Sequence, residues 1–262
     1  MKRRSHTQYL TKALLAALVV TSVAVAHAST LTITYFTIAE TDKDGGDMCC
    51  GISTNYVQSA LGANGLPVFN PGATATSGSV FTPHDLISGN QISWWSPTLN
   101  NGGAMGTSDV TQSGSGVVSL PYTNNDFYPP NGKGPNDLNG FQGAILSGNL
   151  FAPTKETVSF SIASDDMAFL YINGQIACDD GGVHDATAVP CTSSVLPEGN
   201  NSIELFYVDL NPTGAVLDFS VTTAGVTTSS PPTVPEPGSF ALLASGFLGL
   251  AGLVRWKMGK TS

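Results

Sequence analysis

Apolar and polar residues alternate with a period of two in several short segments of the chain, a pattern typical of half-buried strands. Five segments are predicted to be strands: Leu31–Tyr35, Val158–Ile162, Phe169–Ile172, Ile203–Leu205 and Ala215–Val221. Glycine and proline are frequent between them, and no soluble segment sustains a period of 3.6 residues. We therefore predict one all-β domain, an antiparallel β-sandwich with long loops, over residues 29–222.

The region between Ser164 and Asp185 carries the most informative pattern. Asn173-Gly174 separates two apolar runs and predicts a tight hairpin, because a type I′ turn requires positive φ at both central residues. Asp165 and Asp166 precede the first run, and Asp179–Asp185 follows the second as a predicted acidic, glycine-rich loop. The hairpin would bring both acidic groups to the same end, where like charges repel unless a cation joins them. A metal site, with calcium as the expected ion, is the hypothesis.

Each of these acidic positions also has a purely structural interpretation. Asp165 and Asp166 are compatible with two solvated turn aspartates, and Gly181-Gly182 with a simple chain reversal. His184 is a poor calcium ligand, since calcium prefers oxygen, and a structural hydrogen-bonding role is expected.

The N-terminus has the pattern of an export signal, predicted over residues 1–28. Lys2, Arg3 and Arg4 form a positive start, an apolar run extends from Ala13 to Ala26, and small residues follow, so cleavage is expected between Ala28 and Ser29. The run is short for a membrane span, although an uncleaved anchor remains the alternative.

The C-terminus has a second targeting pattern. A Thr/Ser/Pro-rich linker, residues 223–234, precedes Pro235-Glu236-Pro237, an apolar helix-forming stretch and a basic end, so residues 235–262 form a predicted sorting segment. This order resembles the PEP-CTERM sorting signal of Gram-negative bacteria, which an exosortase, a membrane-embedded cysteine protease, recognises and removes. The resemblance implies a precursor held transiently in the inner membrane by its apolar helix, then released to the envelope or extracellular matrix. An ordinary tail anchor is the alternative.

The body of the chain is strongly acidic. The full chain has a formal net charge of −9, but between Ser29 and Val234 only three lysines face 18 carboxylates, a net charge of −15. Such an excess excludes nucleic acid as a partner. Because most of these carboxylates have no cationic partner, they must be solvated or hold metal ions.

The four cysteines are Cys49, Cys50, Cys178 and Cys191. Export makes disulfides expected, and four thiols allow three pairings. Cys178 and Cys191 bracket the acidic loop and are the favoured pair, which leaves the pairing of Cys49 and Cys50 open. None of the four has the spacing of zinc ligands.

The chain also resembles the fibro-slime domain from about Asp47 to Val221. The resemblance rests on motifs that this sequence contains in order: Leu61–Val68, Trp94-Trp95, Asp126–Pro129, Asp165-Asp166, Tyr171–Gly174 and Asp180–His184. The fibro-slime domain is related to protective-antigen-type β-sandwiches, some of which are calcium-dependent lectins of adhesins.

The resemblance implies specific calcium ligands. Asp165 and Asp166 match the paired aspartates that such lectins join by a cis peptide. Asp209 stands where flocculin-type lectins have an asparagine, with Asn211 as a competing candidate. Asp179, Asp180 and His184 form a candidate ligand loop.

Two other features have weaker functional interpretations. The segment Asp42–Asp47 superficially resembles a calcium loop but lacks the later glutamate of an EF-hand, and a solvated turn is predicted. Trp94 and Trp95 would suit sugar stacking, yet a core position is expected.

The sequence predicts an exported, non-enzymatic protein that binds extracellular polysaccharide or another matrix polymer with the help of Ca²⁺. A structural matrix protein in which calcium only stabilises the fold is the alternative, and a secreted polysaccharide hydrolase is a weaker one. No nucleophile elbow, zinc-protease helix or nucleotide-binding fingerprint is present.

Overall fold

The computed structural model describes residues 29–46, 51–76, 78–100, 108–124, 140–211 and 214–230. Several predictions fall outside these residues: the signal peptide with Ala28, the cysteines Cys49 and Cys50, the Asp126–Pro129 motif, and the sorting segment with Pro235, Glu236 and Pro237. Within the described residues, no helix is long and apolar enough to cross a bilayer.

The described residues form an all-β fold, as predicted. The strands are β1 (Thr30–Ile38), β2 (Gly51–Thr54), β3 (Thr74–Ala75), β4 (Leu86–Ile87), β5 (Gln91–Ile92), β6 (Val110–Ser119), β7 (Tyr122–Asn124), β8 (Phe141–Ala152), β9 (Ser159–Asp165), β10 (Met167–Ile172), β11 (Gln175–Val183), β12 (Val189–Thr192), β13 (Gly199–Asp209), β14 (Val216–Val221) and β15 (Thr227–Ser229). All five predicted strand segments lie within or overlap β1, β9, β10, β13 and β14.

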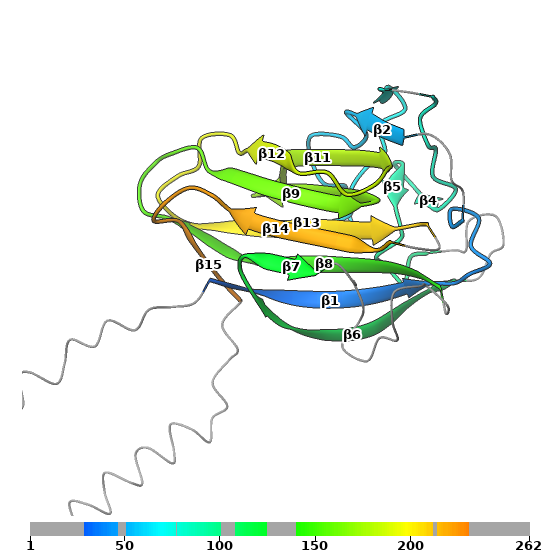
Figure 1. Ribbon diagram of the computed structural model, residues 1–262, viewed down its shortest axis with the longest axis horizontal. Coiled ribbons are helices and arrows are strands. Elements are labelled where there is room, and N and C mark those ends of the chain that lie inside the picture. The colour runs from blue at the N-terminus through cyan, green and yellow to red at the C-terminus, as the bar shows by residue number, and fades with distance from the viewer. Residues whose placement is uncertain are drawn as a thin grey trace, which may run out of the picture.

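Two antiparallel sheets are stacked face to face (Figure 1). The larger sheet has the strand order β3-β2-β11-β10-β13-β8-β1-β6, with β15 also paired to β8. The smaller sheet has the order β12-β9-β14-β7, and β4 and β5 form a separate two-stranded pair. Because β9 and β10 are consecutive in the chain but belong to different sheets, the chain crosses between the sheets at Asp165-Asp166.

The larger sheet is buried on both faces at β10, which explains the continuous apolar run of this strand. Ala168, Leu170 and Ile172 pack into the core between the two sheets. The intervening residues of β10 pack into a second core on the outer face, under the segments that connect β2 to β6. A strand that is buried on both faces is apolar at every position, rather than alternating.

Trp94 and Trp95 belong to this second core. Their side chains are 0% and 3% exposed, and their rings meet edge to face with centroids 5.5 Å apart. The expected core position of this pair is therefore confirmed, and neither ring offers a free face for a sugar.

The hairpin at Asn173-Gly174 forms as predicted, with φ values of 51° and 70° that suit a type I′ turn. The return strand, however, is longer than predicted. β11 continues to Val183, so Asp179–Val183 lies in a strand and the prediction of a loop there is wrong. A Cβ at Gly181 would collide with the Tyr56 side chain, and one at Gly182 with the carbonyl oxygen of Gly51. These glycines allow close approach of neighbouring segments, and do not simply reverse the chain.

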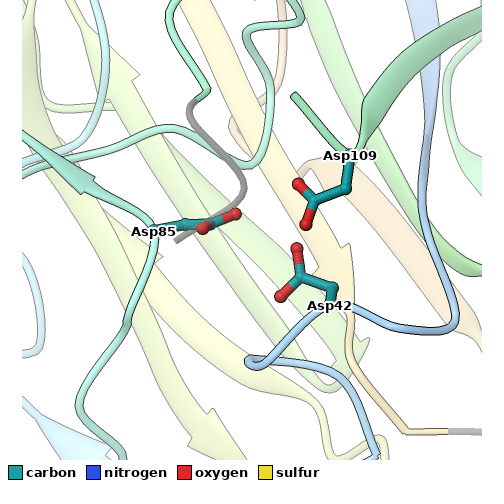
Figure 2. A group of neighbouring side chains, drawn as sticks. All are labelled: Asp42, Asp85 and Asp109. Carbon is teal, nitrogen blue, oxygen red and sulfur yellow. The ribbon is translucent and has the colours of Figure 1, made fainter. Parts of the chain in front are cut away.

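The described aspartates of the segment after β1 are buried, so the prediction that Asp42–Asp47 forms a solvated turn is wrong for Asp42 and Asp44. Asp42 and Asp44 are 5% and 0% exposed. The Asp42 carboxylate faces those of Asp85 and Asp109 (Figure 2). These partners come from distant parts of the chain, so no local pattern around Asp42 predicts its burial.

The sandwich has two distinct ends. At one end, the first and last described segments lie together, since the Thr228 N–H donates to Ser29 Oγ at 3.2 Å. β1, β8 and β13 run antiparallel in register, with Thr32 opposite Ser147 and Asp209 opposite Gln142. Asp209 therefore lies at the opposite end of the sheet from Ser29 and Thr228.

Candidate metal centre

Three carboxylates converge where the chain passes between the sheets. Asp165 ends β9, Asp166 follows it directly, and Asp209 ends the neighbouring strand β13. Each offers an oxygen that lies within 4.8 Å of the others, and the three residues are 9%, 0% and 0% exposed. The structure thus brings together three of the four predicted calcium ligands.

The backbone around these residues is held by hydrogen bonds to β13. The peptide between Asp165 and Asp166 is cis, as the resemblance to the lectins implies. The Leu210 N–H donates to Asp166 Oδ2 at 2.8 Å, and the Tyr207 hydroxyl donates to the Asp165 carbonyl oxygen at 2.7 Å. Asp166 Oδ1 is buried and has no hydrogen-bond partner among the described residues. That oxygen is available to a ligand.

Burial raises the pKa values of Asp165 and Asp166. Burial, followed by the negative charge of Asp166, raises the pKa of Asp165 to about 7, although the nearby His184 opposes the rise. Burial also raises the pKa of Asp166, against the opposing effect of the Leu210 N–H. A cation bound between them would remove this repulsion and favour the ionised forms.

Asn211 provides a neutral oxygen beside the cluster. Its N–H donates to Asp209 Oδ1 at 2.9 Å, so the two residues form a local turn. Its own Oδ1 is buried and has no partner among the described residues. A mixed set of carboxylate and amide oxygens is the donor chemistry that calcium prefers.

Gly214 lies against the same site, and no pattern in the sequence singles it out. A Cβ there would lie 2.9 Å from Asp165 Oδ2, and its φ is +100°. Only the absence of a side chain lets this backbone pass so close to the carboxylate.

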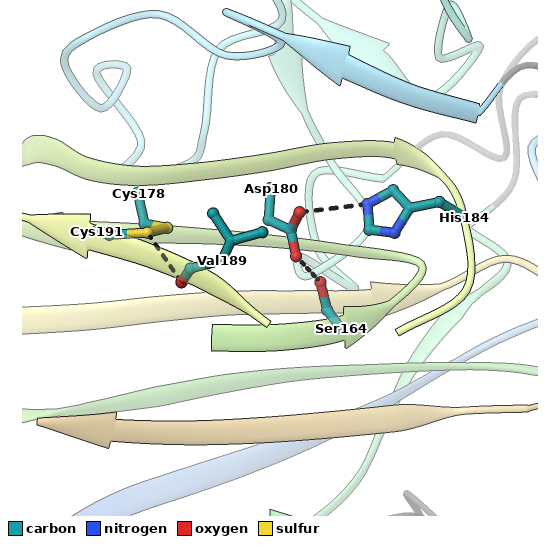
Figure 3. The surroundings of a disulfide bond; sticks show 6 residues. All are labelled: Ser164, Cys178, Asp180, His184, Val189 and Cys191. Carbon is teal, nitrogen blue, oxygen red and sulfur yellow. Dashed lines mark hydrogen bonds and ion pairs between the residues drawn. A yellow bond between two sulfur atoms is a disulfide. The ribbon is translucent and has the colours of Figure 1, made fainter. Parts of the chain in front are cut away.

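Asp180 lies near the site but is not one of the three clustered carboxylates. In Figure 3 its carboxylate lies between Ser164 and His184, with Ser164 Oγ 2.7 Å from Asp180 Oδ2. His184 Nε2 lies 3.3 Å from Asp180 Oδ1, and His184 Nδ1 lies 3.1 Å from the Asp185 carbonyl oxygen. Since both ring nitrogens face acceptors, the imidazolium is favoured; burial opposes this, but the net pKa of His184 is raised. The structural role expected for His184 agrees with this arrangement.

Asp179 points to the other face of the larger sheet, because consecutive strand residues alternate. Its Oδ2 accepts a hydrogen bond from the Val57 N–H at 3.1 Å, and burial raises its pKa to about 7. It borders a polar cleft of about 400 Å³ that is also lined by Asn55, Gln58 and Asn70. The expectation that Asp179 and Asp180 act together in one ligand loop is therefore wrong.

The disulfide that the sequence favours, Cys178–Cys191, is present. Figure 3 shows it two residues before Asp180, joining β11 of the larger sheet to β12 of the smaller one. It restrains the strand that carries both Asp179 and Asp180.

Comparison with known proteins identifies the C-terminal segment. Residues 233–255 match the PEP-CTERM protein-sorting motif, which confirms the motif predicted at Pro235-Glu236-Pro237. The motif implies an exported protein, made as a membrane-anchored precursor and processed by an exosortase, as is typical of Gram-negative cells. No curated protein matches the chain.

Several solved structures are similar to the sandwich at low sequence identity. The PA14 domain of the MpAFP antifreeze protein is 16% identical, with a TM-score of 0.29 over 34% of this chain and 53% of that one. The PA14 sugar-binding domain from an RTX adhesin is 13% identical, with a TM-score of 0.34 over 78% of this chain and 96% of that one. A family 35 carbohydrate binding module from an environmental isolate is 21% identical, with a TM-score of 0.30 over 44% and 95%.

This chain spans only about half of the first of these structures. Similarities of this size do not support an inference about function, and the resemblance to the fibro-slime domain stays a prediction.

Proposed function

We propose that the mature protein is a non-enzymatic component of the cell envelope or extracellular matrix that binds polysaccharide or another matrix polymer in a calcium-dependent way. Calcium would be held by Asp165, Asp166 and Asp209, with Asn211 as a neutral ligand. The observation that carries the proposal is the convergence of three buried carboxylates within 4.8 Å of one another. The imidazole of His184, which lies near this cluster, is already paired with Asp180.

The position of the site supports a role in binding outward-facing polymer. The sorting motif implies that the precursor is anchored through its C-terminal segment. The last described residues lie at the end of the sandwich opposite Asp209. A cation at this site would therefore lie far from the anchored end of the protein.

The test is binding of the purified full chain to immobilised polysaccharides, including matrix polymer from the producing cells. We expect retention in calcium, release by a chelator, and at least about tenfold weaker binding for Asp166→Asn. Glu198→Gln, an exposed acidic residue at the other end of the sandwich, is the matched control and should bind normally. Retention that is unchanged by both the chelator and Asp166→Asn would refute the proposal.

A structural matrix protein is the second candidate, and the depth of burial favours it. Asp166 and Asp209 are fully buried, and Asp165 is only 9% exposed. An ion held there would stabilise the crossing between the sheets even without contacting a polymer. Calcium-dependent melting together with no retention on any polymer would select this candidate. Hydrolysis of a polysaccharide by the purified chain would instead place the protein among the enzymes.

A further inference from the structure

A second cluster of acidic residues lies at the same end of the sandwich and is separate from the first. Asp42 follows β1, Asp85 precedes β4, and Asp109 precedes β6 (Figure 2). Each of the three contributes an oxygen within 4.8 Å of the others. Asp42 and Asp85 are only 5% and 1% exposed, so water cannot solvate this charge freely.

Asp44, in the same region, is a buried carboxylate whose two oxygens both accept hydrogen bonds from the protein. Its Oδ1 accepts from the backbone and ring nitrogens of His84, at 2.6 and 2.8 Å. Its Oδ2 accepts from the Asp85 N–H at 3.0 Å and from Trp94 Nε1 at 2.8 Å. Four donors thus surround the two oxygens, and this buried carboxylate is satisfied entirely by the protein.

The three clustered carboxylates are different, because each keeps one oxygen without a donor. Asp42 Oδ1 accepts from the Asp44 N–H at 2.6 Å and Asp85 Oδ2 from Asn100 Nδ2 at 2.6 Å. The remaining oxygens, Asp42 Oδ2, Asp85 Oδ1 and Asp109 Oδ1, are buried and have no hydrogen-bond partner among the described residues. Figure 2 shows the three carboxylates directed toward one another. An unpaired buried carboxylate oxygen is costly unless a proton or a cation occupies the space between such groups.

Two occupants are chemically possible: a shared proton or a metal ion. Burial, opposed by the Asp44 N–H, raises the pKa of Asp42 to about 8, and burial also raises the pKa of Asp85. A proton shared by Asp42 and Asp85 would satisfy two of the three open oxygens. It would leave the Asp109 oxygen without a partner, whereas one ion can contact all three.

We propose that Asp42, Asp85 and Asp109 form a second binding site for a divalent cation of the hard, oxygen-preferring kind, with Ca²⁺ as the ion that fits an exported protein. The donor set is purely oxygen, which excludes a preference for zinc or copper. The ion would tie the segment before β4 to the end of β1 and the start of β6, two strand ends that already pair through their backbones. It would thereby fix the outer layer that covers the larger sheet.

The two sites are neighbours, but they are tested separately. The Gly46 N–H donates to the Leu210 carbonyl oxygen at 2.7 Å, which connects the segment carrying Asp42 to the one carrying Asp209. The decisive experiment measures calcium bound per full chain, by equilibrium dialysis and metal analysis at neutral pH after metal stripping. We expect two ions for the wild type, and one for Asp166→Asn, in which the second cluster is intact.

Substitutions in the second cluster assign the remaining ion. Asp85→Asn and Asp109→Asn should each weaken binding at one site by about 100-fold, because calcium affinity follows the charge of the ligand set. Each should keep one ion at the Asp165 site, which also demonstrates that the variant folds. Glu40→Gln, an exposed carboxylate two residues before Asp42, is the matched control and should keep both ions.

The outcomes separate this inference from the proposed function. If the wild type binds one ion that Asp85→Asn removes and Asp166→Asn retains, the second site stands and the first one fails. If Asp166→Asn binds no calcium, the second site is refuted, whatever the cluster variants do. Unchanged binding by Asp85→Asn and Asp109→Asn refutes it equally, and a shared proton then explains the cluster.

Discussion

At the scale of single residues, an oxygen without a hydrogen-bond donor, rather than burial alone, distinguishes a candidate ligand from a structural carboxylate. Asp44 and Asp166 are both fully buried. Asp44 has donors at both oxygens, whereas Asp166 Oδ1 has none among the described residues. Because an ionised carboxylate without partners is costly inside a protein, the open oxygens rather than the satisfied ones mark where a cation is needed.

Gly214 gives a direct test of the Asp165 site. Gly214→Ala would place a Cβ against Asp165 Oδ2 and should lower calcium affinity by about tenfold, or about 1.4 kcal/mol. Gly199→Ala is the matched control, because its φ of +101° is the same but nothing lies within 4 Å of its Cβ. Both variants should lose similar stability in the absence of metal, since both force alanine into a left-handed conformation. Equal calcium affinity in the two, measured by isothermal titration calorimetry, would contradict the placement of the ion.

The raised pKa values predict opposite pH dependence with and without metal. Asp165 and Asp179 each have a pKa raised to about 7, so the folded, metal-free protein binds protons that the unfolded chain releases near pH 4. Their contribution to stability is fully present below about pH 4 and is lost as the pH rises through about 7. The midpoint of thermal unfolding in chelator should therefore be higher at pH 5 than at pH 8.

Calcium should reverse this order, since the ion requires the ionised form of Asp165. Its affinity is expected to fall by about tenfold per pH unit below pH 7. The same melting series, repeated in excess calcium, measures this effect. A chelated protein that melts higher at pH 8 than at pH 5 would show that these carboxyls are not the groups that dominate the titration.

At the scale of elements, the sequence predicts strands and turns that depend on local patterns. It does not predict features that depend on contacts with distant segments. The alternation in β1 and β9 and the Asn-Gly turn after β10 are local signals, and all three predictions are confirmed. The length of β11 was missed because Gly181 and Gly182 suit a turn by composition. In fact, they allow Tyr56 and Gly51 to approach the strand.

The candidate sites divide in the same way. Asp165 and Asp166 are adjacent in sequence, so the sequence alone is enough to predict that they lie together. Asp42, Asp85 and Asp109 were not found as a group, because each belongs to a different segment without periodic structure. The pairing of β1 with β6 brings Asp42 close to Asp109, and the packing of the segment before β4 on the outer face of the larger sheet adds Asp85.

The disulfide offers a prediction at this scale, because it joins the two sheets. Replacing both Cys178 and Cys191 with alanine opens a loop of 13 residues and should lower the free energy of unfolding by about 3 kcal/mol. Urea unfolding monitored by tryptophan fluorescence measures the loss. The wild type in reducing agent is the control and should approach the stability of the double variant. A loss that is indistinguishable from zero would mean that the sheets are held together by their core alone.

For the whole molecule, the two acidic clusters lie at one end of the sandwich and the first and last described segments lie at the other. The Ser230 N–H donates to Thr30 Oγ1 at 3.3 Å, so both chain ends leave the sandwich together. Both acidic clusters lie at the other end of the sandwich, where β1 and β13 end. There, Ile38 pairs with Phe141 and Asp209 pairs with Gln142. A chain held by its C-terminal sorting segment would therefore present the acidic end outward.

This polarity predicts that bulky groups at the two ends have different effects on polymer binding. Glu40 and Glu198 are both exposed, but Glu40 follows β1 at the acidic end and Glu198 precedes β13 at the attached end. Glu40→Cys and Glu198→Cys, each coupled to a large polyethylene glycol maleimide, form a matched pair. We expect the label at position 40 to reduce the calcium-dependent retention on immobilised polymer at least about tenfold. The label at position 198 should leave this retention unchanged. Wild type treated with the same reagent controls for labelling elsewhere. Equal inhibition by both labels, or inhibition only by the label at 198, would place the polymer away from the acidic end and leave calcium with a purely structural role.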